Sequence, residues 1–260
     1  MTGEDIAEVW QLLDRDHLRE VVLRGPPPVF ASVSGAHLYG FASPDSDVDL
    51  RGAFLLPVES VLGLNPPKET VTLDVHERYE LDWVAHDLRK FSRLLTQHNG
   101  YVLEQLYSPL VVVSSPLFLE LREVARGCIT RPTVRHFRGF ARGRRRRLVE
   151  PGASVKHLLY AYRVLLAGIH LMKTGEVCSS LSRLNDEYRL DVLDELMARK
   201  REGAEKMLLA PGEAEVHGRR LDSLEEELAR AHAESRLPEE PTGVRELEEL
   251  VIRARLGQAR

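Results

Sequence analysis

Residues 34–40 read Ser-Gly-Ala-His-Leu-Tyr-Gly, and residues 45–52 read Asp-Ser-Asp-Val-Asp-Leu-Arg-Gly. The apolar run at 29–33 that precedes the first stretch predicts a strand. The alternation of Val48 and Leu50 with acidic residues predicts a second strand. The chain therefore reads as strand, glycine-containing loop and strand, with carboxylates where the second strand begins.

The acidic residues Asp47 and Asp49 are the predicted centre of the chemistry. Residues i and i+2 of a strand point to the same face, so these two carboxylates are expected to project together while Val48 and Leu50 face the core. Two neighbouring carboxylates repel each other, and a divalent cation removes that cost. Mg²⁺ bound by two acids and substrate phosphates is a common arrangement in phosphoryl and nucleotidyl transfer. We therefore expect Asp47 and Asp49 to be catalytic and to bind Mg²⁺ or Mn²⁺.

The loop before these acids is the predicted phosphate site. Gly35 and Gly40 allow backbone N–H groups to approach a phosphate closely, and a helix that begins here would add its dipole. Ser34 and His37 complete the expected nucleotide-binding loop. His37 and Tyr39 could contact phosphate or base, but the favoured interpretation is that one of them packs beneath the loop. Either pattern alone is common, but the glycine loop and the acid pair in this order and spacing are much more specific.

The two stretches resemble the signature of the DNA polymerase β-like nucleotidyltransferase superfamily. They resemble more closely its RNA-repair-associated (RlaP-like) branch from bacteria and phages. Residues 86–91 with 99–104, and Lys156-His157 leading to Tyr162-Arg163, extend this resemblance over most of residues 30–175. The resemblance implies a metal-dependent enzyme that moves a nucleoside monophosphate from a nucleoside triphosphate to an acceptor hydroxyl. It also implies that the acceptor is an RNA 3′ end.

The resemblance further implies a third catalytic and metal-binding carboxylate on a neighbouring strand. Asp82 fits best, because an acid between apolar strand residues needs a partner, and Glu80 is the alternative. Asp47 and Asp49 would then hold two Mg²⁺ ions, with Asp82 completing the second site. The superfamily commonly has serine directly after the first glycine of the loop, where this chain has Ala36. The loss of that hydroxyl weakens the expected grip on triphosphate.

A second group of expected nucleotide-binding residues comes from the region with helical periodicity. Lys156, Tyr160 and Arg163 fall at i, i+4 and i+7, which places them on one helix face. Their charges would neutralise a triphosphate, and Tyr160 could stack on a base. Spacing alone fits an ordinary solvated face equally well, and the resemblance favours function.

Residues 131–147 contain eight arginines and no acidic residue. Such a run suits a nucleic-acid backbone. It could also be a solvated face or dock against the acidic helices later in the chain. Arg51 could bind phosphate or RNA, or pair with an acid. The candidate RNA-binding residues are Arg51, Arg142, Arg144, Arg145 and Arg146.

The periodicities predict an α+β fold in which a small mixed-sheet nucleotidyltransferase domain is followed by an all-helical domain. We expect the catalytic domain at 1–114 and the helical domain, which would complete the nucleotide and acceptor cleft, at 115–260. The predicted strands are 29–33, 48–56, 70–75, 78–85 and 110–113. The predicted helices are 4–20, 86–97, 117–126, 132–149, 154–173, 186–202, 214–235 and 243–257.

Composition sets further bounds. The chain has 260 residues, 43% of them hydrophobic, and a net charge of −4, which is typical of a globular protein. No run approaches the ~18 apolar residues of a membrane span, and the N-terminus is acidic, so we expect a cytoplasmic protein without membrane partners. The oligomeric state stays open. So do two other functions: nucleotidylation of a protein or small molecule, and a non-catalytic RNA- or nucleotide-binding module.

Overall fold

The computed structural model describes residues 1, 3–203 and 207–258 and divides into two compact units. The sheet unit contains Gly3–Gly35, Asp47–Thr130 and the segment from Glu240 onward. The helical unit consists mainly of Ala36–Ser46 and Arg131–Glu239. The loop between the predicted phosphate-binding glycine and the acids is therefore packed with the helices, although the chain on either side of it belongs to the sheet unit.

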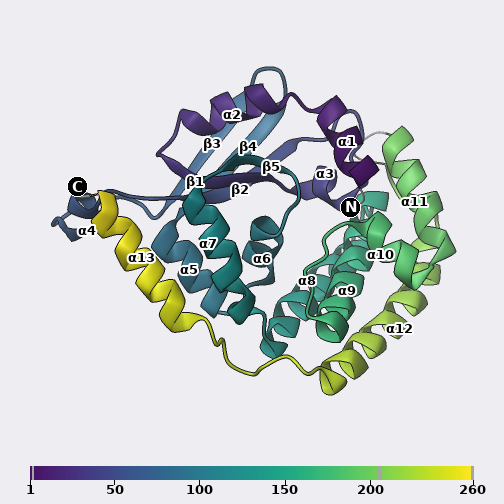
Figure 1. The fold of residues 1–260 in the computed structure, drawn as a ribbon. Helices are drawn as coiled ribbons and strands as arrows, with labels where there is room; N and C mark the ends of the chain where they lie inside the picture. Colours follow the sequence, from purple (N-terminus) through teal and green to yellow (C-terminus); the bar gives the residue numbers. More distant parts are fainter. Residues whose placement is uncertain (2, 204–206, 259–260) are drawn as a thin grey trace. The chain divides into compact units, whose positions relative to one another are not determined.

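A five-stranded mixed sheet in the order β3-β4-β2-β1-β5 forms the centre of the sheet unit (Figure 1). Strands β2 and β4 are parallel, and the other neighbouring strands are antiparallel. The pleat explains the burial pattern, because Val48 and Leu50 are buried while Asp49 between them is partly exposed. The strands are β1 (Pro28–Val33), β2 (Val48–Phe54), β3 (Thr70–His76), β4 (Glu80–Asp87) and β5 (Val111–Ser114).

Helices cover both faces of this sheet. Helix α2 (Arg15–Leu23) packs on β1 and β5, and α5 (Leu88–Thr96), α6 (Gly100–Leu106) and α7 (Pro116–Val124) lie on the other face (Figure 1). Phe30 of β1 stacks on Phe118 of α7 with a ring separation of 4.8 Å. The remaining helices of this unit are α1 (Gly3–Leu12), α4 (Val58–Leu62), the short 3-10 helix η1 (Ala125–Cys128) and the C-terminal α13 (Val244–Gln258).

The helical unit is organised around α9 (Val155–Thr174), which is buried along most of its length. Ser154 and His157 form a capping box at its start, and Gly175 ends it in the left-handed conformation. Gly168 lets Phe137 and Leu228 approach, since an added Cβ would lie 2.9 Å from the Phe137 side chain. The surrounding helices are α8 (Val134–Leu148), α10 (Leu181–Tyr188), α11 (Asp191–Glu202) and α12 (Glu213–Glu234), with the 3-10 helix η2 (Arg131–Thr133) before α8.

The α+β class is confirmed, and several predicted boundaries are corrected. The helix expected at 4–20 is two helices, because the Asp14 side chain accepts from the backbone N–H groups of Asp16 and His17 and starts α2. The helix expected at 186–202 is also divided, since Arg189 adopts a left-handed conformation with φ of 51°. The short helices α4 and α6 were not predicted, and the stretch expected as a glycine loop contains the short helix α3 (Gly35–Tyr39).

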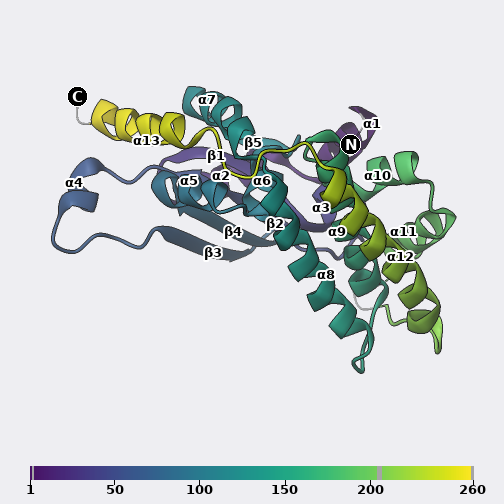
Figure 2. The same ribbon diagram turned by 90° about the horizontal axis from the view of Figure 1, so that it is seen from below.

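The division into units differs from the single predicted boundary near Ser114. Helix α7 stays with the sheet unit because it packs on β1. Helix α13 returns to the same unit and packs against α5 and α7 (Figure 1, Figure 2). The closing of a nucleotide cleft by the helical segment stays a prediction. Among the described residues, no helix combines the length and the apolar character that crossing a bilayer requires.

Candidate active site

The parallel register of β2 and β4 brings Asp49 and Asp82 side by side. The two residues are direct partners in this pairing, so their side chains share a face of the sheet. Their side chains are 31% and 39% exposed, which leaves both carboxylates accessible to a substrate. The remaining predicted acid, Asp47, lies one residue before β2 and is exposed. The strand alternation that was expected to place Asp47 beside Asp49 therefore begins one residue after Asp47.

Arg51 joins the two paired carboxylates. Its Nη2 donates to Asp49 Oδ1 at 2.6 Å and to Asp82 Oδ2 at 2.8 Å. Its Nε donates to the Tyr101 hydroxyl of α6 at 2.9 Å, and its Nη1 donates to the carbonyls of Leu50 and Asp82. The guanidinium is thus held within the sheet unit as an ion-pair partner, which is one of the two roles that the sequence left open.

The electrostatics of Arg51 follow from these partners. Burial by itself lowers the pKa of the guanidinium, but Tyr101, Asp49 and Asp82 more than offset this effect and raise the pKa overall. Arg51 therefore carries a full positive charge between two acids at any physiological pH.

Gly35 is required by Asp49. Its φ is +61°, and a Cβ at this position would lie 1.9 Å from Asp49 Oδ2. The backbone N–H of the neighbouring Ser34 donates to the Asp49 carbonyl at 2.8 Å. The first glycine of the motif thus admits the carboxylate of the acid that follows, in addition to any approach it allows to phosphate.

The donors suit a divalent cation in kind, since Mg²⁺ and Mn²⁺ favour carboxylate oxygens and two converge here. Glu80, the alternative third acid, begins β4 as an exposed residue opposite His76. Asp74 pairs with Asp82 across β3 and β4 and is exposed. Within residues 1, 3–203 and 207–258, no three acidic, histidine or cysteine side chains are grouped closely enough to hold a metal. Asp47 would have to turn towards the pair to complete a three-acid site.

The segment from Ala36 to Ser46 begins within α3 and continues as a loop, and the end of helix α11 holds this loop. Gly40 has φ of +87°, and its carbonyl accepts from Nη2 of Arg201 at 2.6 Å. The fully buried Lys200 donates from Nζ to Ser43 Oγ, which lies 3.0 Å from Ser46 Oγ. Lys200 and Arg201 were missed by the sequence analysis, because two basic residues at a helix C-terminus are typical of solvated positions.

Helix α9 meets the same loop from within the helical unit. Arg163 is 3% exposed, and its guanidinium carbon lies 3.7 Å from the centre of the Tyr39 ring. Tyr160 packs edge-on against Tyr39 and Phe41, each at 5.5 Å. The predicted shared face is therefore present for Tyr160 and Arg163, and it faces the loop. Lys156 is partly exposed on the first turn of α9.

Two polar residues of the predicted loop are buried. Ser34 has no exposed surface, and its hydroxyl oxygen has no hydrogen-bond partner among the described residues. His37 is 6% exposed. Both are thus in packed positions from which a phosphate contact would require rearrangement.

The seven arginines of α8 fall into two groups. In the first, Arg145 pairs with Asp222 and Glu225 of α12, Arg147 pairs with Glu150, and Arg144 lies over the Tyr160 ring at 4.7 Å. Arg145 thus follows the alternative in which the basic run docks against later acidic helices. The other group has no ion pair with any described residue and follows one side of the helix at i, i+3, i+7 and i+11. It consists of Arg135, Arg138, Arg142 and Arg146, and we name it the arginine row.

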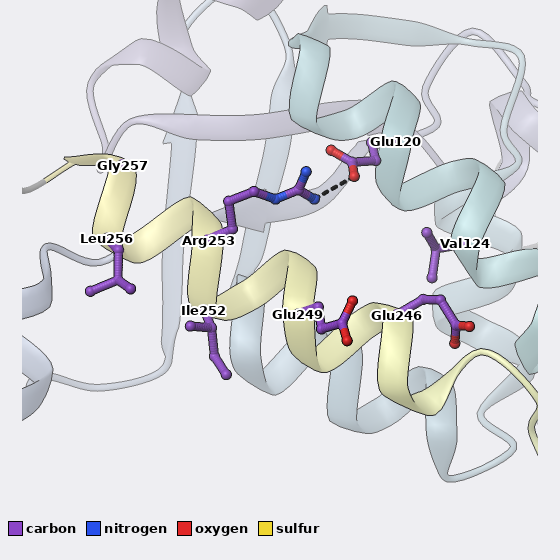
Figure 3. A pocket seen from close by; sticks show the side chains of 8 residues that line it. All are labelled: Glu120, Val124, Glu246, Glu249, Ile252, Arg253, Leu256 and Gly257. Carbon is purple, nitrogen blue, oxygen red and sulfur yellow. Dashed lines mark hydrogen bonds and ion pairs between the residues drawn. The ribbon is translucent and has the colours of Figure 1, made fainter.

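A hollow of about 800 Å³ lies between α7 and α13 in the sheet unit (Figure 3). Its lining includes the carboxylates of Glu120, Glu246 and Glu249 and the apolar side chain of Ile252. Its arginine, Arg253, is already paired with Glu120. Three carboxylates and one paired cation do not suit a triphosphate, so this hollow is no rival to the acid pair as a nucleotide site.

Comparisons with known proteins identify a family for this chain. Residues 14–253 match a family described as the RNA repair pathway DNA polymerase beta family, RlaP. The chain is similar to the uncharacterized protein MJ0002 of Methanocaldococcus jannaschii, with 32% identity over 65% of this chain and 71% of that protein. It is also similar to the uncharacterized protein YcgL of Bacillus subtilis, with 27% identity over 68% of this chain and 71% of that protein.

Proposed function

The chain belongs to the RNA repair pathway DNA polymerase beta family, and we propose that it transfers a nucleoside monophosphate from a nucleoside triphosphate to an acceptor hydroxyl. The observation that carries this proposal is the pairing of Asp49 with Asp82 across β2 and β4, directly beside Gly35. Both carboxylates are partly exposed, and Gly35 lets the chain pass close to one of them.

The proposed reaction is an in-line displacement. The acceptor oxygen attacks the α-phosphorus, the bond from that phosphorus to the bridging oxygen breaks, and pyrophosphate leaves. Asp82 would accept the hydroxyl proton, because its carboxylate remains partly exposed beside Asp49. Asp47, Asp49 and Asp82 would hold Mg²⁺ or Mn²⁺, which supplies charge stabilisation to the attacking and leaving oxygens when it is bound.

The loop and α9 would position the nucleotide. Arg163 stacks on Tyr39, and Arg201 holds the Gly40 carbonyl, so both fix the segment between Gly35 and Asp47. A fixed loop keeps its N–H groups in place for phosphate, which compensates for the hydroxyl that Ala36 lacks. Lys156 is partly exposed on the first turn of α9, and the expectation that it contacts phosphate stays a prediction.

We propose that the acceptor is the 3′ end of an RNA, and the arginine row of α8 supports this choice. Successive members such as Arg138, Arg142 and Arg146 are four residues apart, a rise of about 6 Å each, so they present a line of positive charge to a phosphate backbone. Their charges are unpaired among the described residues, so RNA binding would not first have to break ion pairs. A small-molecule acceptor would have no use for such a row.

The test of the chemistry is an assay with labelled nucleoside triphosphates, RNA and Mg²⁺ or Mn²⁺. Wild type should extend the RNA, and the Asp47→Asn/Asp49→Asn double variant should lose at least about a thousandfold in rate. Asp16→Asn is the matched control, because Asp16 is an exposed acid of the same unit that lies on α2, away from β2 and β4. Activity that survives in the double variant contradicts the mechanism. Label that enters a protein or a small molecule instead of RNA would identify the alternative acceptor.

A further inference from the structure

Arg51 lies where the carboxylates of Asp49 and Asp82 converge. A single nitrogen, Nη2, donates to one oxygen of each acid at 2.6 and 2.8 Å. The same two carboxylates would hold the divalent cation of the proposed reaction, which would supply charge stabilisation there. The guanidinium and that cation therefore depend on the same two acids.

The guanidinium is fixed by more than the two acids. Tyr101 accepts from Nε at 2.9 Å, and the carbonyls of Leu50 and Asp82 accept from Nη1 at 2.7 and 2.8 Å. The Arg51 side chain is only 12% exposed. These contacts hold the guanidinium in place whether or not the carboxylates have another ligand. Its positive charge therefore always repels an incoming cation.

We propose that Arg51 is a built-in counter-cation that competes with the divalent metal for Asp49 and Asp82 and thereby sets the metal affinity of the site. The inference rests on the proposed function. Two carboxylates that share one guanidinium present a net charge of −1 to a metal, and the guanidinium repels a divalent ion a few ångströms away. The chain alone therefore binds metal weakly, and tight binding requires the added charge of the nucleotide phosphates.

This inference is tested by titrating the full-length chain with Mn²⁺ in the absence of nucleotide and following the electron paramagnetic resonance signal of free Mn²⁺. Arg51→Gln removes the charge and should tighten Mn²⁺ binding by at least about tenfold. Tyr101→Phe removes only one anchor of the guanidinium and should tighten binding by a smaller factor. Arg24→Gln is the matched control: Arg24 is an exposed arginine of the same unit that pairs with Glu77, and its removal should leave the affinity unchanged.

Unchanged or weaker Mn²⁺ binding in folded Arg51→Gln overturns the inference, because an arginine that only positions the acids would help metal binding. Circular dichroism establishes that the variant is folded. If Arg51→Gln does not fold, Tyr101→Phe decides in the same way: tighter binding supports the competition, and unchanged or weaker binding overturns it.

Asp49→Asn separates this inference from the proposed function. If Asp49→Asn leaves Mn²⁺ binding as in wild type, the metal site of the proposed function fails. If Asp49→Asn abolishes binding while Arg51→Gln matches wild type, the metal site stands and only the role of Arg51 fails.

Discussion

Arginines serve opposite purposes in two regions of this molecule. In the sheet unit, Arg51 and Arg255 are nearly buried, and each donates to a carboxylate and to at least one backbone carbonyl. On α8, the arginine row is unpaired among the described residues. A buried charge is costly unless every partner is present, whereas an exposed charge costs little to keep or to lose. Burial therefore predicts which arginines the fold depends on and which are available to a ligand.

The largest effect on stability is expected at Arg255. This residue of α13 pairs with the fully buried Asp87 and also donates to the Leu56 carbonyl. Arg255→Met should lower the free energy of unfolding by about 3–5 kcal/mol, because it leaves a buried carboxylate without its cation. Urea unfolding would measure this loss.

Arg253 is the matched control on the same helix. It pairs with Glu120 while both side chains are well exposed, so Arg253→Met should cost less than about 1 kcal/mol. Equal losses in the two variants would contradict the view that burial separates these arginines.

A smaller loss of stability, with a large effect on the site, is expected at Gly35. The left-handed backbone and the 1.9 Å approach to Asp49 Oδ2 mean that Gly35→Ala must shift the carboxylate. Strain of this kind costs about 1–3 kcal/mol, and Mn²⁺ binding should weaken together with stability. Gly139→Ala, in α8 with open space around it, should instead be neutral or stabilise by up to about 1 kcal/mol. If the Gly35→Ala variant keeps wild-type Mn²⁺ binding, Gly35 does not control the position of the Asp49 carboxylate.

The sequence predicted the local features of this site and missed those that depend on contacts distant along the chain. Strand alternation placed Val48 and Leu50 in the core and Asp49 on the accessible face, as the structure confirms. The role of Arg51 could not be chosen, because it depends on the register that brings Asp82 beside Asp49.

The same reason explains why the sequence did not predict the return of α13 to the sheet unit or the contact of Lys200 with Ser43. The return of α13 depends on Arg255 reaching Asp87, 168 positions away, and no periodicity carries that information. Lys200 is likewise buried only because Ser43 lies against the end of α11. A buried lysine cannot be told from a solvated one by its neighbours in sequence.

A pH-dependent effect is expected at His86, near the buried end of β4. Burial, followed by the charges of Lys90 and Arg51, lowers the pKa of His86 to about 4. The unfolded chain takes up this proton at about pH 6.5, and the folded chain does so only near 4. The stability linked to His86 is therefore fully present above pH 6.5 and is lost as the pH falls towards 4.

Urea unfolding at pH 7.5 and pH 5 compares wild type with His86→Gln. Wild type should lose more stability between the two pH values than His86→Gln, which has no proton to take up. An identical pH dependence in both proteins would show that His86 is not the group responsible.

The smallest effect on stability is expected from the arginine row. Glutamine at Arg142 or Arg146 should change the free energy of unfolding by less than about 0.5 kcal/mol, because neither side chain has an ion-pair partner among the described residues. For RNA binding, each charge that meets a phosphate contributes about 0.7 to the slope of log affinity against log salt. The double variant Arg142→Gln/Arg146→Gln should therefore reduce that slope by about 1.4, as measured by fluorescence anisotropy over a range of salt concentrations.

Arg145→Gln gives the opposite result if burial and pairing divide these arginines correctly: it should cost stability by breaking the contacts with α12 and leave the salt slope unchanged. If Arg145→Gln lowers the slope by as much as each of the other two positions does, the pairing of Arg145 gives way to RNA. The distinction between structural and available arginines would then not hold on α8.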